Sequence, residues 1–568
     1  MENNHCVARV YNSLVKIFPE AKAPVWEPEC GVLTALLQER VSFQVAYSQN
    51  VSEQAEQTGR MRYARVEAVC DQAADVQVRQ VVCVPNSYPA HKTFDDNYLR
   101  TEPGMYPDLL EELRDGLVSF SPTQWKALWV DVRPDAQAPE GRMEVRIRFT
   151  DPDTGELLCE ASQEIMVYRV SLPEQTLKRT EWFHADCLAD YYHVPVFSEA
   201  HWEILERFIR CAAQHGINML LTPVFTPPLD TAVGGERTTV QLVEVYAEDT
   251  ENGRSYRFDF AKLVRWIRLC LSCGISYIEI SHLFSQWGAV SAPKVMAYVN
   301  GAESRSRIFG WETPAVGGAY TEFLRAFLPQ LLEVLRREGV GDRCFFHISD
   351  EPSREQQESY RAARESVAGL LEGQVIMDAL SDLEFYQKGY VTLPVCATNH
   401  IHTFLDAGVH SVWSYYCTAQ WNRVSNRFLA MPSARTRIYG LQLFKYQIEG
   451  CLHWGFNFYN AAESRYPIDP FGDTASGGVF PGGDPFLVYP GPQGAPQGSI
   501  RLMVMEEAMN DLRAMNLLAS YIGREAVIAM LQEDLPFEIT FETYPKSDYY
   551  LLRLRAKINA ALARHQKG

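Results

Sequence analysis

The chain has 568 residues, of which 46% are hydrophobic and 22% are charged, a composition typical of a globular protein. Its length exceeds what one ordinary hydrophobic core holds, so two or three domains are expected. The formal net charge of −18 argues against a surface for nucleic acid or anionic membranes. No run of about 18 uncharged apolar residues occurs, so no membrane span is expected.

The sequence shows no export signal, because no apolar segment near its start is followed by a small-residue cleavage site. We therefore expect a cytoplasmic protein, or a secreted one if a signal peptide has been removed. The 13 cysteines are scattered without a framework and are expected to be reduced thiols. Cys270 and Cys273 form a C-x-x-C within a helical pattern, but the second pair that a structural zinc site needs is missing.

Residues 1–175 are predicted to form a β-rich domain. Short β-branched segments such as VSFQVAYS, KALWVDVRP and MEVRIRFTD follow one another, and turn signals such as DPDTGE separate them. This pattern predicts an N-terminal antiparallel β-sandwich.

Residues 176–525 alternate between apolar strand-like runs and helical patterns. Eight such runs occur, from EWFHADCLADYY and NMLLTPVFT to SVWSYYC and CLHWGFNFYN. The clearest helix is AYTEFLRAFLPQLLEVLRREG, whose apolar residues recur at i, i+3 and i+4. The alternation favours an α/β fold with a (β/α)8 TIM-type barrel over a doubly wound open sheet, and the fifth and sixth helices are expected to be short.

Two further segments follow the last strand candidate. The Gly/Pro-rich stretch 466–499 is expected to form a long loop on the active face of the barrel. A helix then closes the barrel, and residues 526–568 are predicted to form a helical C-terminal extension.

The strongest candidates for catalysis are Asp350 and Glu351, at the end of the fourth strand candidate, CFFHISDEP. Catalytic groups of barrel enzymes lie at such strand ends, and Pro352 and Ser353 suit the start of the next helix. Two carboxylates held close together resist simultaneous ionisation, so one keeps a proton that it can donate to a glycosidic oxygen. The alternative is a plain helix start, where acidic residues favour the helix dipole.

The adjacency of this pair bears on the type of glycosidase. Ordinary retaining enzymes hold two carboxylates about 5–5.5 Å apart, whereas adjacent residues of a strand point to opposite faces. Asp350 and Glu351 therefore suit substrate-assisted cleavage better, in which the acetamido oxygen of the sugar is the nucleophile. The strand must then curl at its end so that both groups face one cleft.

Aromatic side chains gather near other predicted strand ends, where they offer apolar platforms for sugar rings. Core packing is the alternative for each of them. With nearby polar side chains, the candidate substrate-binding residues are His282, Trp287, Asn399, Trp413, Tyr415, Trp454, Asn457 and Asp484.

An H-x-H pair, His400 and His402, follows the sixth strand candidate and could bind zinc from one face of a strand. No third ligand has a recognisable spacing. We therefore expect no metal and no other cofactor.

These motifs resemble the catalytic domain of glycoside hydrolase family 123. The resemblance rests on DEP at 350–352, on HWGFNFYN, on the loop GGDPFLVYPGP and on SIRL before a final helix, and it covers roughly residues 180–525. The family includes N-acetyl-β-galactosaminidases, and a preceding β-sandwich fits its layout. The resemblance implies a retaining, substrate-assisted mechanism in which Asp350 orients the acetamido group and Glu351 is the acid/base.

The preferred hypothesis is an exo-acting β-N-acetylgalactosaminidase acting on an oligosaccharide or glycoconjugate with a terminal amino sugar. A second hypothesis is a β-glycosidase for a sugar without an acetamido group, with Glu279 or Asp378 as a separate nucleophile. A third is a carbohydrate-binding protein on an inactive barrel. No nucleic-acid or membrane partner is expected, and the sandwich and the tail could both support a homo-oligomer.

Overall fold

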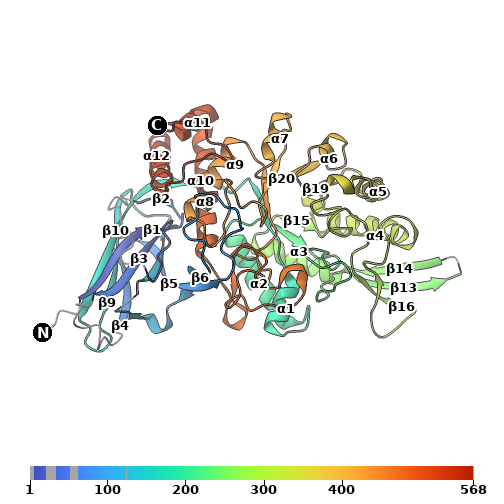
Figure 1. Cartoon of the computed structure of the whole chain (residues 1–568), viewed down its shortest axis with the longest axis horizontal. Helices are drawn as coiled ribbons and strands as arrows, with labels where there is room; N and C mark the ends of the chain where they lie inside the picture. Colours follow the sequence, from blue (N-terminus) through green and yellow to red (C-terminus); the bar gives the residue numbers. More distant parts are fainter. Residues whose placement is uncertain (1–4, 21–32, 51–61, 123, 252, 567–568) are drawn as a thin grey trace. The chain divides into compact units, whose positions relative to one another are not determined.

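The computed structural model describes residues 5–20, 33–50, 62–122, 124–251 and 253–566 (Figure 1). The chain forms two compact units, and each is built from segments that are separate in the sequence. The first unit comprises Met1–Gln175, Asn422–Gln447 and Gln497–Gly568, and the second comprises Thr176–Trp421 and Ile448–Pro496. The three-part division at 175 and 525 stays a prediction.

Two five-stranded sheets form the N-terminal part of the first unit, in the orders β1-β3-β8-β5-β6 and β2-β10-β9-β4-β7. Alternate residues of a strand share one face of the sheet. The residues on one face of each sheet are buried together in a single core, which includes Val45 and Val130 from one sheet and Val145 and Ile147 from the other. The sheets therefore pack face to face. Their strands are β1 (His5–Asn12), β2 (Leu33–Leu37), β3 (Val41–Asn50), β4 (Arg62–Cys70), β5 (Ala74–Asn86), β6 (Gly104–Glu112), β7 (Leu117–Phe120), β8 (Lys126–Pro134), β9 (Gly141–Thr150) and β10 (Leu157–Ser171), with a 3-10 turn, η1 (Arg114–Gly116), before β7.

One strand pair departs from the predicted antiparallel arrangement. β2 pairs with β10 in parallel, with Ile165 opposite Leu33 and Val167 opposite Ala35. Parallel neighbours need a long connection instead of a tight hairpin, and the many residues between these two strands provide one.

The second unit contains a closed barrel of eight parallel strands. Its interior is filled by buried side chains, among them Met219, Phe345, Val395 and Trp413. In the order of their pairing around the barrel the strands are β11 (Lys178–Glu181), β12 (Met219–Thr222), β15 (Tyr277–Ile280), β18 (Cys344–Phe346), β19 (Val375–Leu380), β20 (Leu393–Ala397), β21 (Trp413–Tyr415) and β22 (Gly450–His453).

Helices follow the barrel strands along the chain, and those after β19 and β20 are short, as the sequence predicted. The first strand candidate, EWFHADCLADYY, was misplaced, because β11 covers Lys178–Glu181 and shares only Glu181 with it, and ADCLADYY is helical. The apolar side chains of that helix are buried, which gives it the composition of a strand. The helices are α1 (Ala185–Tyr192), α2 (Glu199–Gln214), α3 (Ala261–Cys273), α4 (Gly318–Arg337), α5 (Gln357–Val367), α6 (Glu384–Gln387) and α7 (Ile401–Asp406), with the 3-10 turns η2 (Gly341–Arg343) and η3 (Arg354–Gln356).

A four-stranded sheet, ordered β14-β13-β16-β17, is inserted into the connections that follow β12 and β15. The sequence analysis did not predict it. Its strands are short and mostly exposed on one side, so their apolar signal is weak. They are β13 (Glu244–Thr250), β14 (Gly253–Asp259), β16 (Val295–Val299) and β17 (Ser306–Phe309).

The Gly/Pro-rich segment after β22 is irregular, as expected, and contains only short elements: η4 (Ala462–Ser464), β23 (Tyr489–Pro490), η5 (Pro492–Gly494) and β24 (Pro496–Gln497). The remaining helices belong to the first unit: α8 (Ser433–Arg437), α9 (Tyr439–Lys445), α10 (Ile500–Ile522), α11 (Arg524–Gln532) and α12 (Asp548–Gln566). The C-terminal extension is therefore helical. No helix among the described residues combines the length and apolarity needed to cross a membrane.

Candidate active site

The end of β18 brings both members of the carboxylate pair to one cavity. Strand pairing stops at Phe346, and Glu351 has a φ of 40°, in the left-handed region that non-glycine residues rarely adopt. Such a conformation has an energetic cost and persists only where its surroundings hold it. It removes the alternation of an extended strand, so Asp350 and Glu351 both line a cavity of about 170 Å³.

The cavity lies at the carboxyl ends of the barrel strands. Its lining comes from segments that follow β11, β12, β15, β18, β21 and β22, together with β19 and the Gly/Pro-rich loop. Most of the lining is aromatic or aliphatic, with a few polar groups, as in sites that bind small ligands. The lining residues are Trp182, His184, Leu229, Asp230, Gln286, Trp287, Asp350, Glu351, Ala379, Tyr415, Cys417, Thr418, Leu452, Trp454 and Phe480.

The two carboxylates differ in their hydrogen bonds. The Tyr415 hydroxyl donates to Oε1 of Glu351 at 2.6 Å, whereas no described residue donates to the side chain of Asp350. Burial raises the pKa of both, and the Glu351 charge raises that of Asp350 well above its usual range. The hydrogen bond from Tyr415 opposes the rise at Glu351. The pair therefore retains a proton at pH values where isolated carboxyl groups have lost theirs.

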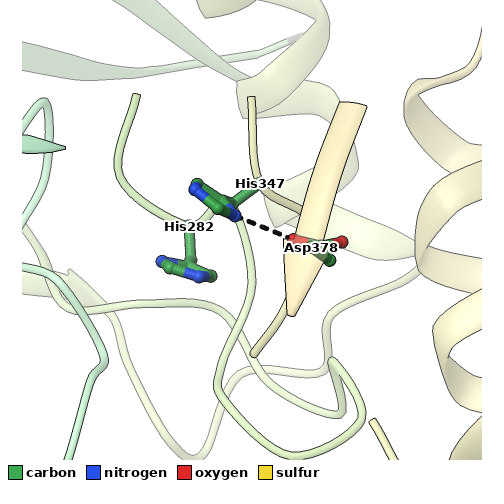
Figure 2. Close-up of side chains that lie close together, drawn as sticks. All are labelled: His282, His347 and Asp378. Atoms are coloured by element: carbon green, nitrogen blue, oxygen red, sulfur yellow. Dashed lines mark hydrogen bonds and ion pairs between the residues drawn. The ribbon is translucent and has the colours of Figure 1, made fainter. Parts of the chain in front are cut away.

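A buried charge cluster lies within the barrel, formed by three neighbouring strands. His347 follows β18, and its Nδ1 lies 3.0 Å from Asp378 Oδ1 (Figure 2). Its Nε2 lies 2.7 Å from Glu279 Oε1. Burial alone would lower the pKa of His347, but the two carboxylates outweigh it and raise the pKa to about 9. His347 is thus an imidazolium at neutral pH, and its charge favours the ionised form of Asp350.

His282, His347 and Asp378 also raise the question of a metal, because each places one ligand atom within 4.8 Å of the others. The His282 and His347 rings lie side by side in Figure 2. They are stacked, with centroids 4.2 Å apart and planes at 20°. Metals bond in the plane of an imidazole, so stacked rings are badly placed to share one ion. Both nitrogens of His347 also face carboxylates already. We therefore assign His347 and Asp378 to charge pairing.

The aromatic walls of the cavity are held by buried carboxylates. Trp454 Nε1 donates to Asp484 Oδ2 at 2.8 Å, and His453 Nε2 lies 3.1 Å from Asp484 Oδ1. After the neighbouring strand β11, Trp182 Nε1 donates to Glu279 Oε1 at 2.7 Å. Each indole is thus fixed in orientation, which lets it serve as a rigid apolar surface.

Asp230 and His184 are cavity residues that the sequence analysis missed. Burial raises the pKa of Asp230 to about 6 against the opposing charge of Arg237. Burial and then Arg237 lower the pKa of His184 to about 4, so its ring is neutral, with Nδ1 3.1 Å from an Arg237 nitrogen. His184 comes two residues after the aromatic Trp182, just beyond the end of the first strand. Its position at a strand end is a signal in the sequence that could have identified His184 as a cavity residue.

The predicted substrate-binding residues separate into those at the cavity and those behind it. Trp287, Tyr415 and Trp454 line the cavity, and Asn399 lines an adjoining groove. Among the residues that do not line either space, Asn457 holds the backbone of His184 through bonds of 2.9 and 3.0 Å. The residues outside both linings are His282, Trp413, Asn457 and Asp484.

Comparisons with known proteins bear on this site. The family description "Glycoside hydrolase 123, catalytic domain" matches residues 182–518. Among solved structures, a family 123 glycoside hydrolase from Clostridium perfringens, described in work on glycolipid glycan hydrolysis, is 13% identical with a TM-score of 0.71. The similarity covers 99% of this chain and 97% of that one.

Other solved structures are much less similar to this chain. A putative β-galactosidase from Bacteroides fragilis is 10% identical with a TM-score of 0.30, covering 88% of this chain and 62% of that one. No curated protein matches the sequence. The match over residues 182–518 includes more than half of the chain and every barrel strand but β11. The protein therefore belongs to glycoside hydrolase family 123 and is a glycoside hydrolase.

Proposed function

We propose that the protein is a retaining, exo-acting β-N-acetylgalactosaminidase that works by substrate-assisted catalysis. The observation that carries the proposal is that Asp350 and Glu351, although adjacent, line one cavity because Glu351 has a left-handed backbone. The small cavity suits the terminal sugar of a chain. The strand and helix order around it supports a (β/α)8 TIM-type description of the barrel.

In this mechanism the acetamido oxygen attacks C1 of the sugar while the bond from C1 to the leaving oxygen breaks. Glu351 gives its proton to that oxygen, and Asp350 accepts a hydrogen bond from the acetamido N–H. Glu351 then takes a proton from water as the water attacks C1 and the bond from C1 to the acetamido oxygen breaks, which re-forms the acetamido group and restores the original configuration. Asp350 suits its role because no described residue donates to its carboxylate, so the substrate can.

The surroundings of Glu279 and Asp378 weigh against either as a separate nucleophile. Glu279 accepts hydrogen bonds from Thr180, Trp182 and His347, and neither acid lines the cavity. Asp378 accepts from Tyr360, from His347 and from the backbone N–H of Ile348. These contacts consume the lone pairs that an attack on C1 would need. An inactive binding barrel is also disfavoured, since that function requires no proton-retaining pair.

The test is hydrolysis of aryl β-glycosides of GalNAc, GlcNAc and galactose by the wild type and three variants. Glu351→Gln is expected to lower kcat on the GalNAc compound by roughly 10²–10⁴-fold. Asp350→Asn should lower it as well, whereas Glu355→Gln, an exposed control on η3, should leave it unchanged.

A trifluoroacetamido analogue of the GalNAc compound tests the nucleophile. Its fluorines withdraw electrons from the carbonyl oxygen, so substrate assistance predicts a much lower kcat. An unchanged kcat, or efficient cleavage of the β-galactoside, would contradict the mechanism. Sugar binding without turnover, insensitive to Glu351→Gln, would favour the binding protein instead.

A further inference from the structure

The first unit contains a large groove of its own. Its volume is about 930 Å³, near the upper end of the roughly 300–1,000 Å³ that ligand sites occupy. The lining comes from the loop between β5 and β6, from residues 422–423 and from the segment that joins α11 to the first turn of α12, all within the first unit. The lining residues are Phe94, Asp95, Asp96, Asn97, Asn422, Arg423, Leu535, Phe537, Glu542, Thr543, Tyr544, Pro545, Lys546, Ser547 and Tyr550.

Two exposed phenyl rings line this groove from different segments. Phe94, in the loop after β5, is 48% exposed, and Phe537, after α11, is 37% exposed. The Phe94 ring packs edge-on against Tyr98, with centroids 5.7 Å apart, so it has a fixed neighbour on one side. Both rings keep apolar surface in water that folding normally buries. Exposed aromatic rings in a concave surface indicate a place that a ligand or a partner covers.

Asp95 fixes one part of the lining. Its carboxylate accepts two hydrogen bonds from the Arg435 guanidinium, at 2.9 and 2.8 Å, and one from the backbone N–H of Arg423 at 2.5 Å. The loop after β5 is thereby joined to residues 422–423 and to α8. Lys546 pairs with Asp96, which links the same loop to the segment before α12. A lining that is formed before binding loses little conformational freedom when a ligand arrives.

Other polar groups of the lining are available to a ligand. Among the described residues, none forms a hydrogen bond or an ion pair with the side chain of Asn422, Arg423 or Glu542. Arg423 also has a φ of 66°, a left-handed conformation with an energetic cost. An amide, a guanidinium and a carboxylate together supply both donors and acceptors, which suits hydroxyl groups.

The charges of the lining favour a neutral occupant. The two acids of the loop after β5 are each paired with a base, and the unpaired groups are one carboxylate, Glu542, and one guanidinium, Arg423. This balance does not attract a polyanion. A protein partner is disfavoured, because the cores of protein interfaces are depleted of charged residues and this lining carries five. An oligosaccharide fits both features, since sugar rings have apolar C–H faces for phenyl groups and hydroxyls for the polar groups.

We propose that this groove is a non-catalytic binding site for a neutral oligosaccharide. A second point of contact keeps the enzyme on a glycan that carries several cleavable ends, because it raises the effective concentration of substrate at the catalytic cavity. The inference does not depend on which terminal sugar the catalytic cavity takes.

Calorimetry on Glu351→Gln, chosen to prevent cleavage, tests the site with three neutral probes, cellotetraose, chitotetraose and a galactotetraose, and with a hyaluronan tetrasaccharide as the charged probe. At least one neutral probe should bind, and Phe94→Ala and Phe537→Ala should each raise its Kd by about tenfold or more. Tyr63→Ala is the control, because Tyr63 is exposed on β4 and lies outside the groove lining. Binding of no neutral probe, tighter binding of hyaluronan, or Kd values that the phenylalanine variants leave unchanged would overturn the proposal.

Photolabelling locates the bound sugar without relying on a variant. A diazirine derivative of the probe that binds should label residues 94–97, 422–423 or 535–550. Labelling confined to the catalytic cavity would contradict a second site. Analytical ultracentrifugation addresses the alternative occupant, because self-association that disappears in Phe94→Ala would assign the groove to a second copy of the chain instead. Hydrolysis of an aryl glycoside by Phe94→Ala and Phe537→Ala should match the wild type, since neither ring lines the catalytic cavity.

Discussion

Glu351 combines a rare backbone conformation with a directed side chain. Its left-handed φ of 40° has an energetic cost, and the Tyr415 hydroxyl then fixes its carboxylate through a 2.6 Å hydrogen bond. Because a hydroxyl donor favours the ionised carboxylate, Tyr415 sets how long Glu351 holds its proton as pH rises.

Removal of the Tyr415 hydroxyl should therefore move the pH profile. In Tyr415→Phe the pKa of Glu351 rises, so the acid form survives to higher pH and the basic limb of kcat/KM should shift to higher pH. The measurement is the pH dependence of kcat/KM on an aryl glycoside. Tyr277→Phe, at the start of β15 and away from the cavity lining, is the control. A limb that stays in place or moves downward would contradict this role of Tyr415.

At the scale of elements, the buried imidazolium of His347 links three barrel strands through Glu279 on β15 and Asp378 on β19. Its pKa in the folded protein is raised to about 9, above the usual value of about 6.5. The stability that it contributes is therefore complete below about pH 6.5 and disappears as pH rises through about 9.

His347→Gln should consequently destabilise the protein in a pH-dependent way. At pH 6 the free energy of unfolding should fall by up to about 3 kcal/mol, and the difference from the wild type should shrink toward pH 10. Urea unfolding at pH 6, 8 and 10 measures this. A difference that is the same at all three pH values would show that His347 stabilises by packing alone.

The packing of β21 against β22 depends on Gly450. A Cβ at this position would lie 2.2 Å from the ring of Trp413, which is buried in the barrel core. Trp413 thus fills the barrel interior, the alternative that the sequence analysis left open for every aromatic.

Gly450→Ala should force this ring to move and lower the free energy of unfolding by about 1–3 kcal/mol or more. Denaturant unfolding and tryptophan fluorescence would register it. Gly369→Ala is the control, because a Cβ there meets nothing within 4 Å. Equal stability of the two variants would mean that the strands adjust without cost.

The elements themselves were largely predictable. Six of the eight strand candidates contain a whole barrel strand and the eighth begins one residue inside β22, because parallel strands buried on both faces are continuous apolar runs. The first candidate shares only Glu181 with β11. The errors arose where a helix gives the same apolar run as a strand, or where a strand gives little of it. The buried helix α1 looked like a strand, and the mostly exposed strands β13 and β14 have few apolar residues.

At the scale of the whole molecule, the first unit joins distant segments through buried ion pairs. Asp511 of α10 accepts from Arg437 of α8 at 2.7 Å and from Arg555 of α12 at 2.8 Å. Arg555 also pairs with Glu39, which follows β2. These contacts connect the three segments that make up the unit.

Asp511→Ala should destabilise this unit by about 3–5 kcal/mol, because it leaves two buried guanidinium groups without a shared partner. Thermal and denaturant unfolding measure the loss. Glu333→Ala, which breaks the exposed pair with Arg336, should leave stability nearly unchanged, because solvent screens this pair. Similar effects from the two substitutions would show that the buried network contributes little.

The sequence by itself determined the alternation of strands and helices in the barrel and the place of the carboxylate pair, because apolar strand runs and the DEP strand end are local features. Only the tertiary structure decided which residues share the cavity. Asp230, His184 and Phe480 reach it from distant loops, while Asp484 and Asn457 support it from behind. The direction of a side chain depends on strand closure and on torsions such as φ at Glu351, and neither leaves a local signature in the sequence.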